Sequence, residues 1–119
     1  MSVVMIGLTN NTAQPIAIGA PTAIVGNVLV ALAPDPLTAG ASAAGMVDSP
    51  AHQNELEVNY NPQITTATGT VTLTIDIWIQ GTVFQKFFVA STDPLNYPIQ
   101  GEYSVNGGPD AFAALVTVG

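Results

Sequence analysis

The segment Thr70-Val71-Thr72-Leu73-Thr74-Ile75-Asp76-Ile77-Trp78-Ile79-Gln80 alternates apolar and polar side chains without interruption. Aliphatic residues occupy every second position, and threonine, Asp76, Trp78 and glutamine occupy the others. A period of two residues is typical of a strand with one face against a core. Threonine and isoleucine are branched at Cβ, which suits a pleated sheet and disfavours a helix. We therefore predict a strand over residues 70–80 at the centre of the fold.

Further extended segments lie on both sides of this strand, separated by glycine, proline and asparagine. Residues 2–8 are almost continuously apolar, which is typical of a strand that is covered on both faces. The core covers one face, and either more core or a neighbouring subunit covers the other. The remaining strand candidates are residues 15–18, 23–25, 28–32, 55–60, 83–90, 102–105 and 111–118, with a turn over 106–110. No segment has the period of an amphipathic helix. We predict an all-β chain that forms a single antiparallel β-sandwich or jelly-roll-like domain over residues 1–119.

Residues 37–51 differ in composition from the strand candidates. They are rich in alanine, glycine and serine and reach Ser49-Pro50 with little large apolar surface. We predict a long, flexible Ala/Gly/Pro-rich loop or contact arm here, with at most one helical turn near 41–46. Long loops in compact domains tend to be functional or disordered, so this segment is a candidate for contact with a partner.

The composition restricts the classes of partner. The 119 residues include 1 Lys or Arg against 8 Asp or Glu, and the net charge of −7 disfavours nucleic acid and anionic membranes. Charged residues make up 8% of the chain, whereas soluble domains typically have about 25%. A threonine-rich monomer is one interpretation. The charge deficit favours the other, in which other subunits cover part of the surface.

Targeting signals are weak. Cysteine is absent, so the fold uses no disulfide. The longest apolar segments are shorter than the roughly 20 residues that span a bilayer, so we expect no transmembrane segment. Residues 1–6 lack a basic region, so we predict no signal peptide and expect synthesis in the cytosol, with a place in a virion or surface assembly.

The hairpin after the central strand determines what the outer face carries. A three-residue loop over 80–82 would place Asp76 opposite Lys86 and Trp78 opposite Phe84. A two-residue loop would turn Lys86 towards the core, which is costly for an unpaired ammonium group. We therefore predict the first register, in which the only lysine pairs with a carboxylate.

The outer face then carries Trp78 with Phe84 and, farther along, Phe88. Residues 37–51 of the same chain can shelter these rings, or the rings form a patch that contacts a partner. The two arrangements predict different roles for Trp78, in stability or in association.

Candidate catalytic and metal-binding residues are few. His52 is the only histidine, and neither Asp48 nor Ser49 lies in a motif typical of a nucleophile. Glu55 and Glu57 share a strand face, but with His52 they form no recognised metal motif. We predict no enzyme activity, no catalytic residue, no cofactor and no metal site.

Two functional hypotheses follow. The first is a non-enzymatic structural subunit that forms a homo-oligomer or larger assembly, resembling capsid-decoration or fibre subunits at the level of architecture only. Its predicted interface residues are Trp78, Phe84, Phe88, Val3 and Met5. The alternative is a small module that binds carbohydrate or lipid through exposed aromatic rings. Its predicted ligand-binding residues are Trp78, Tyr97 and Tyr103.

Overall fold

The computed structural model describes residues 1–105 and 112–119, and these contain ten strands and no helix. The strands are β1 (Val3–Asn10), β2 (Ala23–Val25), β3 (Asn27–Ala33), β4 (Ser42–Asp48), β5 (Glu55–Tyr60), β6 (Gln63–Thr66), β7 (Gly69–Gln80), β8 (Val83–Ser91), β9 (Ile99–Val105) and β10 (Phe112–Val118). The all-β prediction is therefore confirmed. The turn predicted at 106–110 lies outside the described residues.

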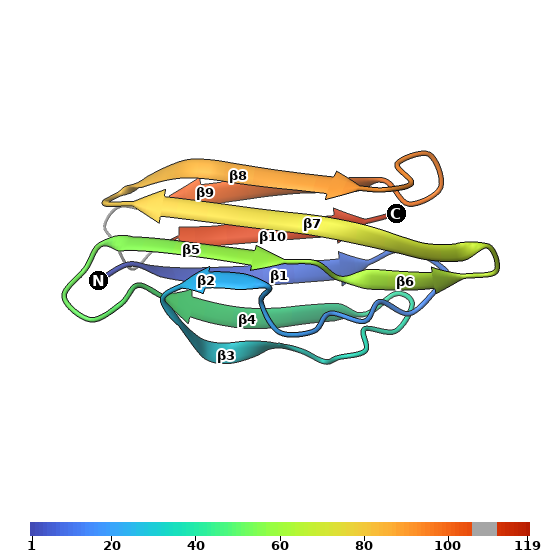
Figure 1. Ribbon diagram of the computed structural model, residues 1–119, viewed down its shortest axis with the longest axis horizontal. Coiled ribbons are helices and arrows are strands. Elements are labelled where there is room, and N and C mark those ends of the chain that lie inside the picture. Colours follow the sequence, from blue (N-terminus) through green and yellow to red (C-terminus); the bar gives the residue numbers. More distant parts are fainter. Residues whose placement is uncertain (106–111) are drawn as a thin grey trace.

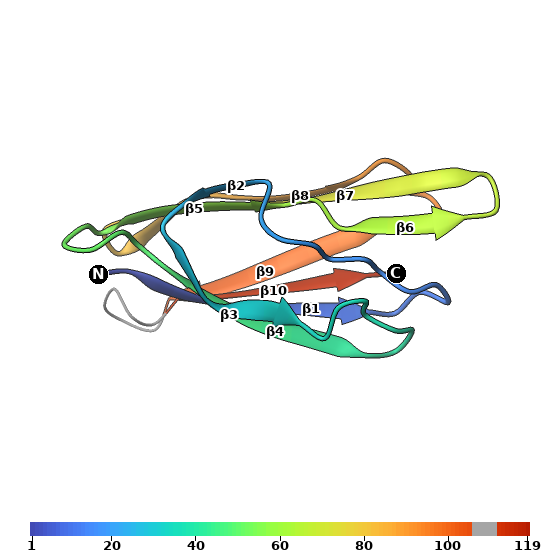
Figure 2. The same ribbon diagram turned by 60° about the horizontal axis from the view of Figure 1, so that its bottom comes forward.

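The strands form two sheets that face each other along an elongated body of 46 × 21 × 21 Å (Figures 1 and 2). Sheet A has the order β3-β4-β1-β10-β9, and sheet B contains β2, β5, β6, β7 and β8. Aliphatic side chains from both sheets fill the space between them as one core. The expectation of a purely antiparallel fold is wrong at one place, because β1 and β10 pair in parallel.

Strand β7 is the long central strand of sheet B, as predicted. Residues 75–80 pair with β5 and residues 69–72 pair with β6 along one edge, while β8 pairs along the other. Its aliphatic residues, Val71, Leu73, Ile75, Ile77 and Ile79, are all at most 6% exposed. Leu56, Val58 and Tyr60 of β5 are buried beside them, so alternation in the sequence correctly identified the core face.

The predicted loop or arm over 37–51 is wrong for residues 42–48, which form β4 between β3 and β1. Ala43 and Val47 of this strand are buried in the core. Gly45 is required because β3 is irregular here: a Cβ on residue 45 would lie 2.9 Å from the Cα of Leu32. The small residues of 42–48 therefore allow two strands to pack closely. From the sequence, we had interpreted them as too small to form part of the core.

The predicted register of the β7–β8 hairpin is also wrong. Gln80 pairs with Val83 across the turn, and a bulge next to Trp78 leaves Gln85 as an extra residue. Beyond the bulge, Trp78 faces Lys86 on the outer side, but Phe84 pairs with the buried Ile79. One extra residue reverses which face a side chain occupies, so Phe84 points towards the core.

Candidate subunit interface

A row of apolar side chains crosses the outer face of sheet A. The strand registers align Val30 of β3, Met46 of β4, Met5 of β1 and Ala113 of β10. Paired residues share a face of the sheet, and Met5 lies on the face opposite to the buried Val4 and Ile6. Met5 is 57% exposed and Val30 is 52% exposed. The second face of β1 is therefore open within this chain, so of the two covers that we predicted, the one by more core is wrong.

A second row lies directly beside the first. It contains Ala33, Ala44, Gly7 and Leu115 in register, and Glu102 of the edge strand β9 ends it. Leu115 is 53% exposed, and its side chain lies across Gly7 so closely that a Cβ there would be 2.9 Å from Leu115 Cδ2. We refer to these two rows together as the apolar face. Because glycine and alanine lie between the larger side chains, the face is low in relief.

Charge is distributed unequally between the two sheets. The sequence contains no Asp, Glu, Lys, Arg or His before Asp35. Among the described residues, the outer side of sheet A carries only Glu102 at its edge and Asp48, which is 6% exposed and accepts a hydrogen bond from Asn27. Strands β1 and β3, which supply half of the apolar face, both lie in this uncharged segment, whereas β4 and β10 come from later in the chain.

The outer side of sheet B has the opposite character. Lys86 Nζ lies 2.7 Å from Asp76 Oδ2, and the ammonium group also lies 5.8 Å from the centre of the Phe88 ring. The hydrogen bond to Asp76 and the charge of that carboxylate raise the pKa of Lys86. The predicted pairing of these residues is therefore present, but diagonally, because Asp76 is directly opposite Phe88.

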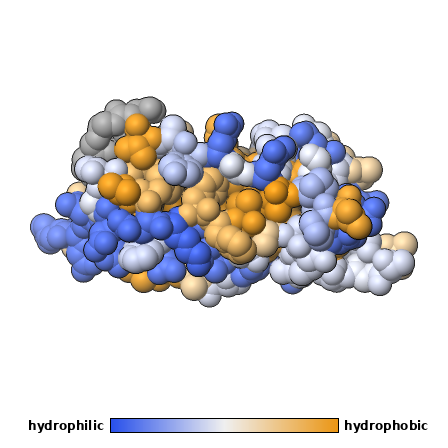
Figure 3. All heavy atoms as spheres, turned by 90° about the horizontal axis from the view of Figure 1, so that it is seen from above, coloured by the Kyte–Doolittle hydropathy of each residue, from blue (hydrophilic) through white to orange (hydrophobic). Residues whose placement is uncertain are grey.

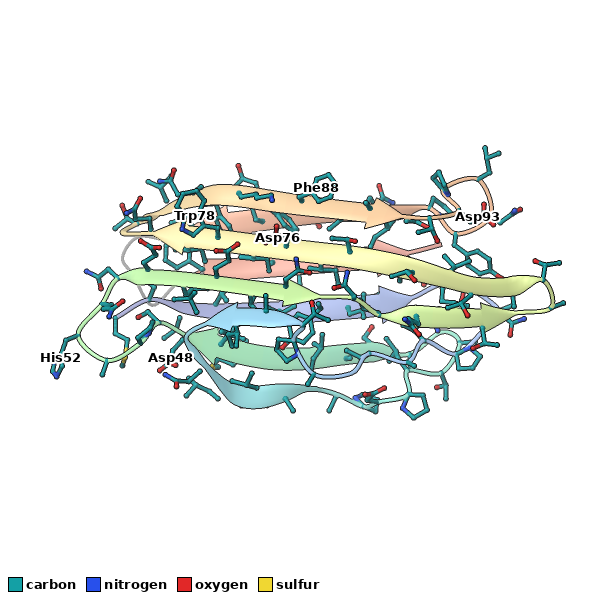
Figure 4. The ribbon with its side chains drawn as sticks, in the orientation of Figure 1. Asp48, His52, Asp76, Trp78, Phe88 and Asp93 are labelled. Atoms are coloured by element: carbon teal, nitrogen blue, oxygen red, sulfur yellow. The ribbon has the colours of Figure 1, made fainter. Side chains whose placement is uncertain are left out.

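Trp78 is half-buried on this charged side, between Glu57 of β5 and Lys86 of β8 (Figure 4). Residues 42–48 cannot shelter its ring, because β4 belongs to the other sheet. Its indole Nε1 is buried and has no hydrogen-bond partner in residues 1–105 and 112–119. Its nearest cross-strand neighbours, Glu57 and Lys86, both belong to its own sheet.

The predicted interface residues thus divide into separate groups. Val3 and Met5 lie on the outer side of sheet A, and Trp78 and Phe88 lie on the outer side of sheet B. Phe84 belongs to an aromatic cluster between the sheets, with ring centres 5.3 Å from Phe112 and 4.5 Å from Tyr103.

This aromatic cluster lies on the side of the molecule bordered by β8 and β9. Figure 3 shows hydrophobic side chains gathered in a band along that side. Phe87 belongs to the same cluster, with its ring centre 5.6 Å from Tyr103. The edge strands β8 and β9 belong to different sheets, so no strand of the described residues closes the gap between them. The aromatic rings cover the core on this side.

The three aromatic residues of the ligand-binding alternative do not meet. Tyr103 lies on β9 beside Phe84 and Phe87, and Trp78 lies on the outer side of sheet B. Tyr97 lines a cleft formed by loops at one end of the molecule. A single ligand site made from all three rings is therefore excluded.

The candidate catalytic residues are also dispersed. His52 is exposed on the loop before β5, at the opposite end of the molecule from Asp93 (Figure 4). Ser49 is buried, donates a hydrogen bond to the Gln53 carbonyl at 2.6 Å and accepts one from the Ser2 amide at 2.9 Å. Within the described ranges, no three His, Cys, Asp or Glu side chains are grouped to hold a metal ion.

No family model matches the sequence, and no curated protein matches it. In the part of the chain that the structure describes, no helix is long and apolar enough to cross a membrane.

Sequence reasoning missed Met46, Ala44 and Leu115 as members of the apolar face. The first two lie in β4, which we had expected to be a loop, and Leu115 lies next to Gly7 only because β1 and β10 pair. Two features of the sequence point to this surface: the absence of charge before Asp35 and the almost continuously apolar residues 2–8.

Proposed function

We propose that this protein is a non-enzymatic structural subunit that assembles with copies of itself through the apolar face of sheet A. The observation that carries the proposal is the alignment of Val30, Met46, Met5, Ala113 and Leu115 on one nearly uncharged surface. Moving exposed apolar area out of water stabilises an interface by about 25 cal/mol for each Å². Large exposed apolar patches in soluble proteins typically mark contact sites.

The charge distribution favours a second copy as the partner. Each copy has a net charge of −7, so two copies repel each other over most of their surface. The outer side of sheet B carries Glu57 and Asp76 with only Lys86 to balance them. The apolar face is where two identical acidic molecules approach with the least repulsion.

The size of the face indicates how far the contact extends. Five strands about 4.8 Å apart, each with about seven residues rising 3.3 Å, give roughly 450 Å² of flat area for the whole outer side of sheet A, of which the two rows are a part. A standard interface buries about 800 Å² on each partner. We propose that the contact continues onto the edge of β3, where Val28 is 40% and Leu29 is 51% exposed.

An uncharged sheet face with an adjoining apolar edge suits a jelly-roll-like sandwich in a capsid-decoration-like or fibre-like assembly. This comparison concerns architecture alone. In this proposal, the remaining charged surface of sheet B faces solvent and keeps the assembly soluble.

Light scattering coupled to size-exclusion chromatography tests the proposal. We expect the wild-type protein to form oligomers whose mass rises with concentration. Leu115→Glu should weaken association at least about tenfold, because it places an unpaired carboxylate in the contact. Thr70→Glu is the matched control: it adds the same charge on an exposed position of β7, in sheet B, and should leave association unchanged.

Two results would contradict the proposal. One is a wild-type protein that stays monomeric at several hundred micromolar, and the other is an equal effect of the two substitutions. Circular dichroism of both variants establishes that each retains its sheet content, so that a loss of association is not a loss of folding.

A further inference from the structure

Loops surround an open cleft at the end of the molecule where β1, β6 and β8 finish. The cleft has a volume of about 780 Å³, within the range of roughly 300–1,000 Å³ that is usual for small-molecule sites. Its lining comes from residues 11–14, 66–68, 93 and 95–98, together with Gly119. All of these residues are described, and they lie outside the apolar face.

The first wall of the cleft is held by a buried asparagine. Asn10 is fully buried, and its Nδ2 donates hydrogen bonds to the carbonyls of Gln14 at 2.8 Å and Leu37 at 2.9 Å. Its Oδ1 accepts a hydrogen bond from the Thr12 amide at 3.0 Å. The loop over 11–14 is therefore fixed by the protein itself.

The opposite wall is a turn that Asp93 organises. The Asp93 carbonyl accepts a hydrogen bond from the Tyr97 amide at 2.8 Å, and its carboxylate accepts one from Asn96 Nδ2 at 3.0 Å. The Pro98 carbonyl accepts a hydrogen bond from Gly119, which ties this turn to the end of β10. A site that is already formed loses less entropy when a ligand binds.

Several polar groups in the cleft remain available to a ligand. The side-chain amides of Asn11 and Gln14 and the hydroxyl of Tyr97 make no hydrogen bond to any residue in 1–105 or 112–119. An amide offers one acceptor and two donors, so it can bind two neighbouring hydroxyl groups. The Tyr97 ring, which is partly buried against the core, adds an apolar surface beside these polar groups.

We propose that this cleft binds a neutral oligosaccharide. Sugars present adjacent hydroxyl groups, which match the amides of Asn11 and Gln14 and the carboxylate of Asp93, and an apolar C–H face, which matches the ring of Tyr97. The cleft contains no lysine or arginine, and the net charge of −7 repels anionic ligands. This inference is independent of the proposed assembly.

An array of neutral di- to tetrasaccharides, printed beside sialylated and sulfated counterparts, supplies the probe. The strongest neutral binder is then titrated into isotope-labelled protein and followed by NMR. We expect the shift changes to lie in residues 11–14, 66–68 and 93–98. Tyr97→Ala removes the stacked ring and should lower the affinity by about tenfold or more. Asn11→Ala removes a paired hydrogen bond and should also lower the affinity.

Tyr103→Ala is the matched control, because it removes a tyrosine ring that lies outside the cleft. It should change the affinity by less than about twofold. Thermal unfolding of the Tyr97 and Asn11 variants separates a lost contact with the ligand from a lost fold. The proposal is overturned by an absence of binding at about 10 mM oligosaccharide, by binding only of anionic glycans, or by shift changes on another surface.

Discussion

The ring of Phe87 on β8 lies against the backbone of Gly101 on β9. A Cβ on residue 101 would come within 2.5 Å of Phe87 Cζ, so only glycine fits without movement of the ring. Gly101 pairs with the buried Val116, and Phe87 pairs with the buried Ile77, so both face the space between the sheets. A ring seated on a glycine therefore joins the edges of two sheets that share no hydrogen-bonded strand here.

Substitution of Gly101 should loosen this side of the molecule. Gly101→Val should lower the free energy of unfolding by about 1–3 kcal/mol, because the new side chain overlaps Phe87 and forces its ring out of place. Urea titration measures the change. Ser104→Val, on the same strand but facing outwards in register with Ala113, should cost less than about 0.5 kcal/mol. Equal losses for the two variants would show that Phe87 accommodates a larger neighbour.

Truncation of Trp78 should affect stability rather than association. The indole is half-buried by its own sheet, between Glu57 and Lys86. Trp78→Ala should therefore lower the free energy of unfolding by about 1–3 kcal/mol, less than for a fully buried tryptophan. Denaturant titration at a concentration where the protein is dissociated gives this value.

The association of the Trp78 variant provides the second measurement. We expect Trp78→Ala to leave the oligomeric mass unchanged, whereas Leu115→Ala should reduce it with little change in subunit stability. A Trp78 variant that dissociates but keeps its stability would place the contact on sheet B, as the sequence alone suggested.

The titration of Lys86 reports on its contact with Asp76. Because Lys86 is the only lysine or arginine of the chain, its side-chain NMR signals are unambiguous. We expect its pKa to lie above the ordinary 10.5, and Asp76→Asn to return the pKa towards that value. Glu102→Gln removes a carboxylate from the other sheet and should not change it. Identical titration curves for the wild type and Asp76→Asn would contradict the contact.

The same contact makes stability depend on pH in one direction. A lysine whose pKa is raised by folding stabilises the folded state fully below the unfolded pKa of about 10.4. That contribution is lost as the pH rises through the folded pKa. As the pH is raised from neutral, the difference in stability between wild type and Lys86→Met should therefore persist until the solution is strongly alkaline.

Among the elements predicted correctly from sequence, the clearest are those in which large and polar side chains alternate. In β7 and β5, every second residue is buried, so apolar and polar residues alternate in the sequence. This alternation can be recognised in a single sequence. Strand β4 was missed because the approach of Leu32 requires glycine at 45, which removed the apolar side chain that would have completed the alternation. The place of Phe84 was missed because the bulge that leaves Gln85 unpaired has no signature in the residues around it.

The candidate interface was predictable only in part. Val3 and Met5 could be identified as candidate interface residues, because their strand is apolar on both faces. Only one of these faces can pack against the core of its own chain. Their neighbours come from β3, β4 and β10, and no local pattern links these strands to β1. Non-local pairing therefore limits what sequence reasoning reveals about a surface that several strands share.

The parallel pairing of β1 with β10 also sets an order of events during folding. Val4 is paired with Phe112, so this contact closes a loop of about 108 residues. Contacts between residues so far apart in sequence form slowly. During synthesis, β1 has no β10 to pair with until nearly the whole chain has left the ribosome. The two rows on sheet A are thus complete only in a finished chain, and nascent chains do not present the surface through which we propose that subunits assemble.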